Sequence, residues 1–182
     1  MYQGGKIGVG IVTYNRKDGL LKLLNSLPRQ CIDELVIIND GQHFPEYSAL
    51  DCHYILNEEN LGVGGSKNLA LSYLREKGVD HYFLIEDDLF VKRNDVFHRY
   101  IEMSRLTGVQ HFNFSQHGLL NVNQQGQPLV RMRCDYAGEK LFMFPSCVGA
   151  FSYYTALALD TVGSWTNVSI MRLNMLTIPL RS

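Results

Sequence analysis

The sequence of 182 residues lacks an excess of charge of either sign, a long apolar run and a signal peptide. Its 17 Lys and Arg residues nearly balance 18 Asp and Glu residues, which gives a formal net charge of −1. Binding to the phosphate backbone of nucleic acids needs a clear basic excess, so we expect no nucleic-acid partner. No stretch approaches the roughly 18 apolar residues of a membrane-spanning helix, and residues 1–6 lack the apolar core of a signal peptide.

Paired cysteines are also absent. Cys31, Cys52, Cys134 and Cys147 stand singly, without a C-x-x-C motif, which indicates reduced thiols rather than a disulfide framework or a zinc site. Together with the missing signal peptide, this predicts a cytoplasmic protein, which could still contact the inner face of a membrane. The content of 46% hydrophobic and 19% charged residues is typical of a soluble protein with a sizeable core. One globular domain is therefore the simplest organisation.

Short apolar segments alternate with amphipathic segments along the first half of the chain. The apolar segments have the length of buried strands, and residues 19–27 carry leucines at helical spacing before Pro28 ends the helix. The predicted strands are 6–13, 34–38, 53–56 and 82–85, and the predicted helices are 19–27 and 66–77. This order indicates an α/β fold with a mostly parallel central sheet flanked by helices. Ligands of such sheets bind at the carboxyl ends of the strands.

Three adjacent carboxylates, Glu86, Asp87 and Asp88, follow the last of these predicted strands. Without a positive partner they would repel one another and weaken the fold, whereas a hard divalent cation would turn them into ligands. A metal–phosphate site is therefore one interpretation of the segment, and a solvated acidic turn is the other. Two more strands end in polar residues, at 13–15 and 39–41. Because the carboxyl ends of parallel strands share one edge of the sheet, we expect all three groups to lie close together.

Four segments resemble, in order and spacing, the motifs of the inverting family-2 glycosyltransferases of the GT-A fold. They are IVTYNR at residues 11–16, VIINDG at 36–41, NLGVGGSKN at 60–68 and FLIEDD at 83–88, the last at the position of the D-x-D motif. Two further segments, 148–152 and 159–163, resemble the region that leads into the acceptor site. The resemblance implies that residues 1–163 form a nucleotide-sugar-binding GT-A domain with an incomplete acceptor half.

The same resemblance implies roles for individual residues. Asp88 would be the direct ligand of Mn²⁺ or Mg²⁺, with Glu86 as a second ligand, and Asp40 would accept a hydrogen bond from the base, which is usually uracil in this family. Three residues depart from the family pattern: Asn39 stands where a second Asp is common, Lys67 replaces Arg, and Glu86 replaces the first Asp of D-x-D. The implied nucleotide-sugar-binding residues are Thr13, Tyr14, Asn15, Asn39, Asp40, Asn60, Gly62, Lys67, Glu86 and Asp87.

The implied activity is the transfer of a sugar from a nucleotide-sugar, with UDP as the expected nucleotide, to a saccharide or glycolipid acceptor with inversion at the anomeric carbon. A cation would stabilise the negative charge that develops on the departing nucleoside diphosphate. A role in bacterial cell-surface polysaccharide biosynthesis follows by analogy with the family. Two alternatives stay open: a domain that binds the nucleotide without transfer, and a nucleotidyltransferase, although residues 13–19 do not form the glycine-rich basic loop expected of the latter.

The C-terminal tail, residues 164–182, differs in composition from the rest of the chain. In the family, the corresponding segment carries an acidic general base for the acceptor hydroxyl, but residues 165–182 contain no Asp, Glu or His. The catalytic base is therefore unassigned. Codons permitted for residues 165–179 can also spell, one reading frame away, an acidic segment similar to that of the family. We therefore expect a truncated or frameshifted acceptor half, and a native apolar tail is the alternative.

Overall fold

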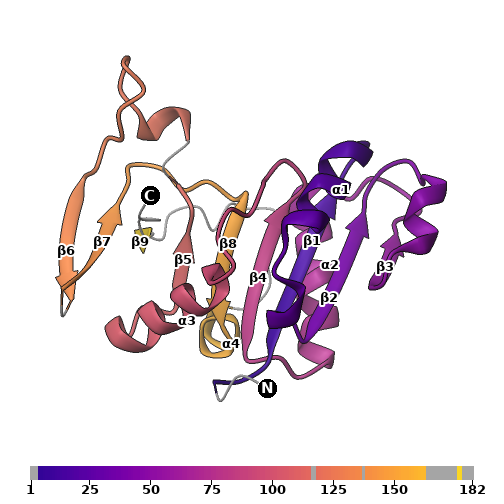
Figure 1. Ribbon diagram of the computed structural model, residues 1–182, viewed down its shortest axis with the longest axis horizontal. Coiled ribbons are helices and arrows are strands. Elements are labelled where there is room, and N and C mark those ends of the chain that lie inside the picture. Colours follow the sequence, from indigo (N-terminus) through magenta and orange to yellow (C-terminus); the bar gives the residue numbers. More distant parts are fainter. Residues whose placement is uncertain (1–3, 116–117, 137, 163–175, 178–182) are drawn as a thin grey trace.

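The computed structural model describes residues 4–115, 118–136 and 138–162, together with the backbone of a short strand at 176–177 (Figure 1). Apart from that strand, the predicted atypical tail lies outside the described residues, and the expectations for it and for the general base remain predictions. Among the described residues, none of the helices has the length and apolar character needed to cross a membrane.

A nine-stranded sheet with the order β3-β2-β1-β4-β8-β5-β9-β7-β6 forms the centre of the fold. Its first four strands are parallel, and all four match predicted strands. The register places Thr13 opposite Asn39 and Val12 opposite Glu86, so the polar residues that end these strands lie at one edge of the sheet. The parallel strands are β1 (Ile7–Thr13), β2 (Glu34–Asn39), β3 (His53–Leu56) and β4 (His81–Glu86).

The other half of the sheet is mixed. β8 (Phe151–Thr155) runs antiparallel to both β4 and β5 (His111–Asn113). β6 (Met132–Tyr136) and β7 (Glu139–Met143) form an antiparallel hairpin that joins the sheet through β9 (Leu176–Thr177). The predicted α/β fold with a parallel central sheet is thus confirmed around β1, and the antiparallel strands extend it on one side.

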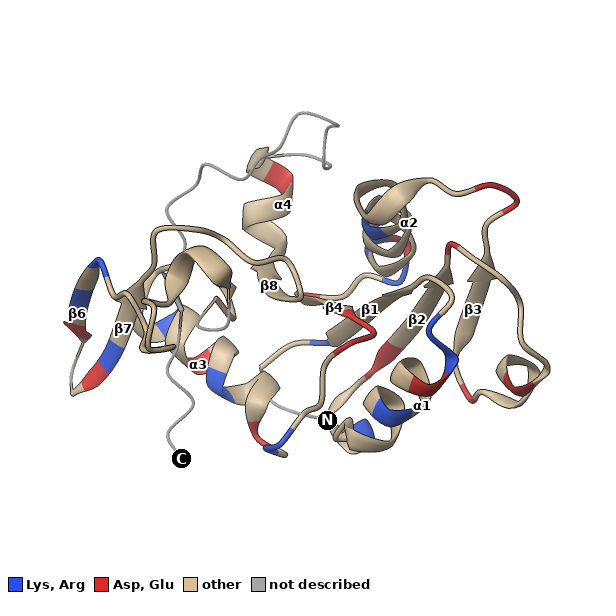
Figure 2. Ribbon diagram, turned by 90° about the horizontal axis from the view of Figure 1, so that it is seen from above, with Lys and Arg blue, Asp and Glu red and all other residues tan. Residues whose placement is uncertain are grey.

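Helices cover both faces of the sheet (Figure 2). α1 (Lys17–Ser26) and α3 (Val96–Thr107) lie on one face, and α2 (Gly62–Glu76) and α4 (Ala156–Val162) lie on the other. Alternate residues of each strand point to opposite faces, so the apolar side chains divide into two clusters. Ile11, Leu23, Phe83 and Tyr100 belong to the first cluster, and Val36, Ala70, Leu74 and Leu84 belong to the second. One-turn helices η1 (Arg29–Cys31), η2 (Pro45–Ala49) and η3 (Leu119–Asn121) lie in the connections.

Two glycines in β1 allow α2 to lie close against the sheet. A Cβ atom at Gly10 would lie 2.7 Å from Ala70 Cβ, and one at Gly8 would lie 2.8 Å from Leu74 Cδ2. Larger side chains at these positions would force the helix away, because the interior is already close-packed. The close contacts hold the middle and second half of α2 against the first half of β1.

The sequence pattern predicts that the helix begins at residue 66, but α2 begins at Gly62. Gly62 has a φ of 70°, a left-handed conformation that favours glycine, and its N–H donates to Asn60 Oδ1 at 2.7 Å. Glycine has a low helix propensity, and the pattern therefore places the start of the helix after Gly64 and Gly65. These two residues belong to the first turn of the helix, not to the loop before it.

Candidate functional site

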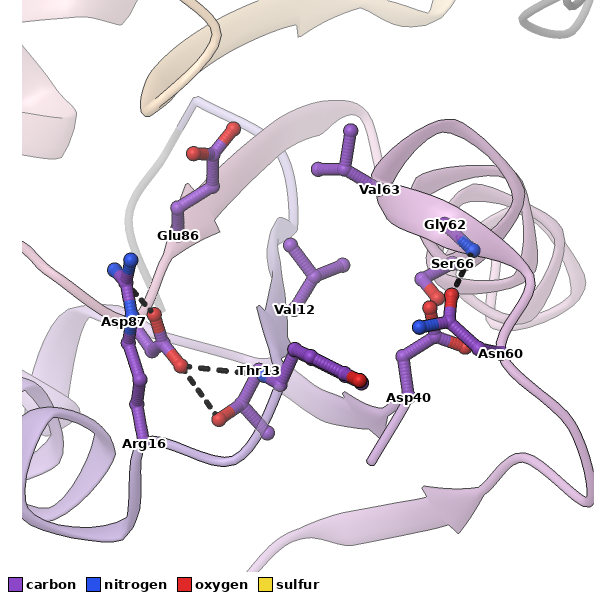
Figure 3. A pocket seen from close by; sticks show the side chains of 11 residues that line it. Val12, Thr13, Arg16, Asp40, Asn60, Gly62, Val63, Ser66, Glu86 and Asp87 are labelled. Atoms are coloured by element: carbon purple, nitrogen blue, oxygen red, sulfur yellow. Dashed lines mark hydrogen bonds and ion pairs between the residues drawn. The ribbon is translucent and has the colours of Figure 1, made fainter. Parts of the chain in front are cut away.

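A cavity of about 290 Å³ lies at the carboxyl ends of β1, β2 and β4 and beside the first turns of α2. Figure 3 shows its lining side chains: Glu86, Asp87 and Arg16 lie on one side, and Asp40, Asn60 and Ser66 lie on the other, with Thr13 between them. Each of the four predicted motifs therefore contributes to one hollow. The full lining is Val12, Thr13, Tyr14, Arg16, Asp40, Asn60, Gly62, Val63, Ser66, Glu86 and Asp87.

Thr13 and Asp87 connect the ends of β1 and β4. The Thr13 hydroxyl donates to Asp87 Oδ2 at 2.6 Å, and the Tyr14 N–H donates to the same oxygen at 3.3 Å. Asp87 is only 5% exposed, and burial raises the pKa of its carboxyl, against the lowering effect of the Thr13 hydrogen bond. Asp87 is therefore held in one orientation with part of its hydrogen-bonding capacity already used.

Asp40 holds the loop that leads into α2. Its Oδ1 accepts from Asn57 Nδ2 at 2.7 Å and from the Leu61 N–H at 2.8 Å, and its own N–H donates to Thr13 O at 2.9 Å. The side chain faces the cavity and is nearly buried, at 7% exposure. Asp40 thus has a structural role in addition to the binding role predicted for it.

Asn15 and Asn39, both predicted to bind the nucleotide-sugar, do not line the cavity. Asn15 adopts a left-handed φ of 57°, and its Oδ1 accepts from the Gln42 N–H at 2.7 Å. Asn39 is 1% exposed, and its amide donates to Gln42 O at 2.9 Å and to the Tyr54 hydroxyl at 2.8 Å. In this structure both side chains fix the loops after β1 and β2, and their predicted contact with a ligand remains a prediction.

Lys67, also predicted as a binding residue, is 3% exposed and does not line the cavity. Its Nζ donates to Glu86 Oε1 at 2.6 Å and to Gly149 O at 2.8 Å. The Glu86 N–H in turn donates to Ala150 O at 2.8 Å. Lys67 therefore joins α2, the end of β4 and the segment before β8, and it neutralises a carboxylate that lines the cavity.

The predicted metal ligands do not converge. Among the described residues, no three His, Cys, Asp or Glu side chains gather as a ready metal site. Glu86 pairs with Lys67, and the half-exposed Asp88, which does not line the cavity, pairs with Arg16 at 3.1 Å. Arg16 also lies 3.5 Å from Asp87 Oδ1. Each of the three carboxylates thus already has a positive group within 3.5 Å. This fits a Mg²⁺ or Mn²⁺ ion that takes one or two carboxylates and completes its shell with phosphate and water.

Four lining residues are absent from the predicted set: Val12, Arg16, Val63 and Ser66. Arg16 directly follows the TYN segment, so its position after a strand end was a usable signal. Val63 escapes a sequence pattern because the predicted helix starts after it, whereas Ser66 lies in the predicted helix and only its direction toward the cavity was not predicted.

Solved structures show where this fold occurs. The mannosyltransferase PcManGT from Pyrobaculum calidifontis, in complex with GDP-Man and Mn²⁺, has a TM-score of 0.62 and 14% identity over 91% of this chain and 48% of that chain. TarS 1–349 from S. aureus, in complex with UDP, has a TM-score of 0.59 and 18% identity over 88% of this chain and 50% of that chain. The chain thus has the GT-A glycosyltransferase fold and spans about half the length of these two proteins.

The sequence comparison gives the family. Residues 8–106, more than half of the chain, match glycosyl transferase family 2. The chain therefore belongs to glycosyl transferase family 2, and the resemblance of the four segments is confirmed. No curated protein sequence matches the chain.

Proposed function

We propose that this chain carries the donor site of a metal-dependent, inverting glycosyltransferase that uses a UDP-sugar and a saccharide or glycolipid acceptor. One observation carries the proposal: a single cavity is lined by residues of all four family motifs, among them Thr13, Asp40, Asn60 and Asp87. Its volume of about 290 Å³ lies at the lower end of the range for small-ligand sites. The cavity would bind the nucleoside end of the donor, and the sugar would lie outside it, toward solvent.

The two sides of the cavity suit the two ends of a nucleotide. Asp40 would accept from the imide N–H of the base, and Tyr14, which is 53% exposed, offers an aromatic face and a hydroxyl to the base or ribose. At the opposite end, next to the lining residue Asp87, Asp88 would hold Mn²⁺ or Mg²⁺ against the diphosphate, and Asp87 would contact the ribose or the water shell of the ion. When bound, the ion would stabilise the charge that develops on the leaving diphosphate. Glu86 could join as a ligand only through an oxygen that Lys67 does not use.

Inversion requires a single in-line displacement. The acceptor hydroxyl attacks the anomeric carbon and loses its proton to a base, and the bond from that carbon to the nucleoside diphosphate breaks. We assign residues 1–163 to the donor domain and residues 164–182 to a tail, and the base stays unassigned. The acceptor class, a cytoplasmic site at the inner face of the membrane and a role in cell-surface polysaccharide synthesis rest on family resemblance.

Thermal melting with a panel of nucleotides tests the proposal. We expect UDP with Mn²⁺ to raise the melting temperature by several degrees, because a ligand that binds only the folded state stabilises it. GDP and ADP with Mn²⁺ should stabilise less, and excess EDTA should remove most of the UDP effect. Equal stabilisation by all three nucleotides would contradict the assignment of UDP, and no stabilisation by any of them would contradict a donor site.

Transfer is measured separately from binding, because the chain spans about half the length of its solved relatives. Release of UDP from a panel of UDP-sugars, with and without oligosaccharide acceptors, reports transfer and hydrolysis. UDP binding without release from any sugar nucleotide would favour the alternative of a transfer-inactive binding domain.

Asp40→Asn should weaken UDP binding about tenfold and leave the melting temperature nearly unchanged. The Asn side chain keeps one oxygen that can accept from Asn57 and Leu61, but it loses the second acceptor that the base needs, a change of about 1–3 kcal/mol. Calorimetric titration with UDP and a melting curve measure the two effects. Asp40→Ala is a poorer test, because two donors in the loop would lose their acceptor and the fold would weaken. An unchanged UDP affinity in Asp40→Asn would show that Asp40 serves the loop alone.

A further inference from the structure

Arg16 lies on the carboxylates at which the proposed function puts the divalent cation. Its Nη1 is 3.1 Å from Asp88 Oδ2 and 3.5 Å from Asp87 Oδ1, so one nitrogen bridges two adjacent acids. Figure 3 shows its side chain next to Asp87, on the side of the cavity away from Asp40. Among the described residues that line the cavity, Arg16 is the single basic one.

The backbone of Arg16 is fixed, whereas its guanidinium is exposed. Arg16 O accepts from the Leu20 N–H at 3.0 Å at the start of α1. The same turn lies so close to the segment after β4 that a Cβ atom at Gly19 would be 2.7 Å from Asp87 O. The side chains of Arg16 and Asp88 are 58% and 50% exposed, and ion pairs between exposed groups are weak. The guanidinium can therefore leave the carboxylates without any movement of the backbone.

We infer that Arg16 is an internal competitor of the metal and a ligand of the donor diphosphate. In the free protein it neutralises Asp87 and Asp88, and when a divalent cation binds it turns to the phosphates. The inference rests on the proposed function, because the diphosphate is the donor's. Its basis is charge: a guanidinium and a dication cannot share the same carboxylate oxygens without repulsion. The planar fork of Arg also suits phosphate oxygens.

A purely structural ion pair would behave differently. If Arg16 only held the β4 end in place, its removal would loosen Asp87 and Asp88 and weaken the binding of both metal and nucleotide. Competition predicts opposite signs: the metal alone binds more tightly when Arg16 is removed, and the nucleotide binds less tightly.

Two titrations of Arg16→Gln separate these cases. The first measures Mn²⁺ binding without nucleotide, by the loss of the free-ion signal in electron paramagnetic resonance, and should show an affinity about two- to fivefold higher than wild type. The second measures UDP binding at saturating Mn²⁺ by calorimetry, and should show an affinity about tenfold lower, since a charge-assisted contact is lost. Arg16→Lys keeps the competing charge without the fork, so we expect wild-type Mn²⁺ affinity and reduced UDP affinity.

Lys17→Gln is the matched control. Lys17 is the next residue, but its Nζ pairs with Glu46 Oε1 at 2.9 Å and not with Asp87 or Asp88. The Lys17→Gln substitution removes the same charge from the same turn as Arg16→Gln, so it measures the effect of net charge alone. Circular dichroism melting of both variants verifies the fold.

Specific outcomes overturn the inference. If Arg16→Gln binds Mn²⁺ no more tightly than Lys17→Gln does, competition is rejected. Competition is also rejected if neither wild type nor Arg16→Gln binds Mn²⁺ measurably. An unchanged UDP affinity rejects the diphosphate contact. If wild type binds no UDP at all, the proposed function fails, whereas the Mn²⁺ titrations still decide whether Arg16 competes at the carboxylates.

Discussion

We expect the Lys67→Met variant to melt about 6–12 °C below the wild-type protein. Lys67 is buried and paired with Glu86 at 2.6 Å, and removal of one partner leaves an uncompensated carboxylate at the end of β4. Breaking a buried pair costs about 3–5 kcal/mol, and we expect about 3 kcal/mol because the Glu86 side chain keeps 29% exposure to solvent. For a chain of this size, each kcal/mol lowers the melting temperature by roughly 2–4 °C.

A double-mutant cycle attributes this loss to the pair. Lys67→Met with Glu86→Gln replaces both charges, so the double variant should recover much of the stability that Lys67→Met loses, with a coupling energy of about 1–3 kcal/mol. Lys17→Met is the control, since its pair with Glu46 lies in solvent, and its melting temperature should change little. A Lys67→Met variant that melts within about 2 °C of wild type would show that the buried pair adds nothing to stability.

The location of the site could be predicted from the sequence because topology decides it. In a parallel sheet the carboxyl ends of neighbouring strands meet at one edge, so Thr13, Asp40 and Asp87 had to lie near one another once β1, β2 and β4 were recognised. The register of the neighbouring strands agrees with this: Thr13 pairs with Asn39 of β2, and Val12 pairs with Glu86 of β4.

The direction of single side chains at that edge could not be predicted in the same way. Asn39 bonds to Tyr54, and Lys67 bonds to Gly149 O, which lies 82 residues away in the chain. Such partners arise from tertiary packing and leave no periodic trace in the sequence. The motif alone therefore assigns Lys67 to a ligand, whereas the fold gives it a carboxylate and a carbonyl as its partners.

The helix boundary at α2 was hidden for a different reason. Gly62, Gly64 and Gly65 are poor helix formers, and only the left-handed conformation of Gly62, with its hydrogen bond to Asn60, starts the helix there. As a result, Val63 belongs to the first turn of the helix and lines the cavity. Local propensity gave the wrong start because it does not register the conformation of Gly62 or its hydrogen bond.

Asp88→Asn should lower the affinity for UDP in saturating Mn²⁺ about 100-fold, to the value that wild type shows in excess EDTA. Asp88 is the carboxylate of the cluster that is most available to a metal, because Glu86 pairs with Lys67 and Asp87 accepts from Thr13. Loss of a direct ligand should cost at least as much as loss of a residue that only orients one, for which about 10–100-fold is typical. Calorimetric titration with UDP at fixed Mn²⁺ measures the effect.

Asp95→Asn is the matched control for this variant. The Asp95 side chain is 47% exposed and pairs with Arg93 at 2.8 Å, much as Asp88 is 50% exposed and pairs with Arg16, but Asp95 lies outside the acidic segment 86–88 and its partner Arg93 does not line the cavity. Both variants should melt close to wild type, because exposed carboxylates contribute little to stability. If UDP stabilises wild type equally in EDTA and in Mn²⁺, the metal role of Asp88 is wrong.

Asp88→Asn also tests the link between Asp88 and Arg16. If Arg16 competes with the metal chiefly through Asp88, its nearer carboxylate at 3.1 Å, then Arg16→Gln should raise the Mn²⁺ affinity of wild type but not that of Asp88→Asn. Groups that act on one shared site are not additive, whereas independent sites are. Additive effects of the two substitutions would mean that Arg16 acts on the metal through the general field of the cavity and not through this contact.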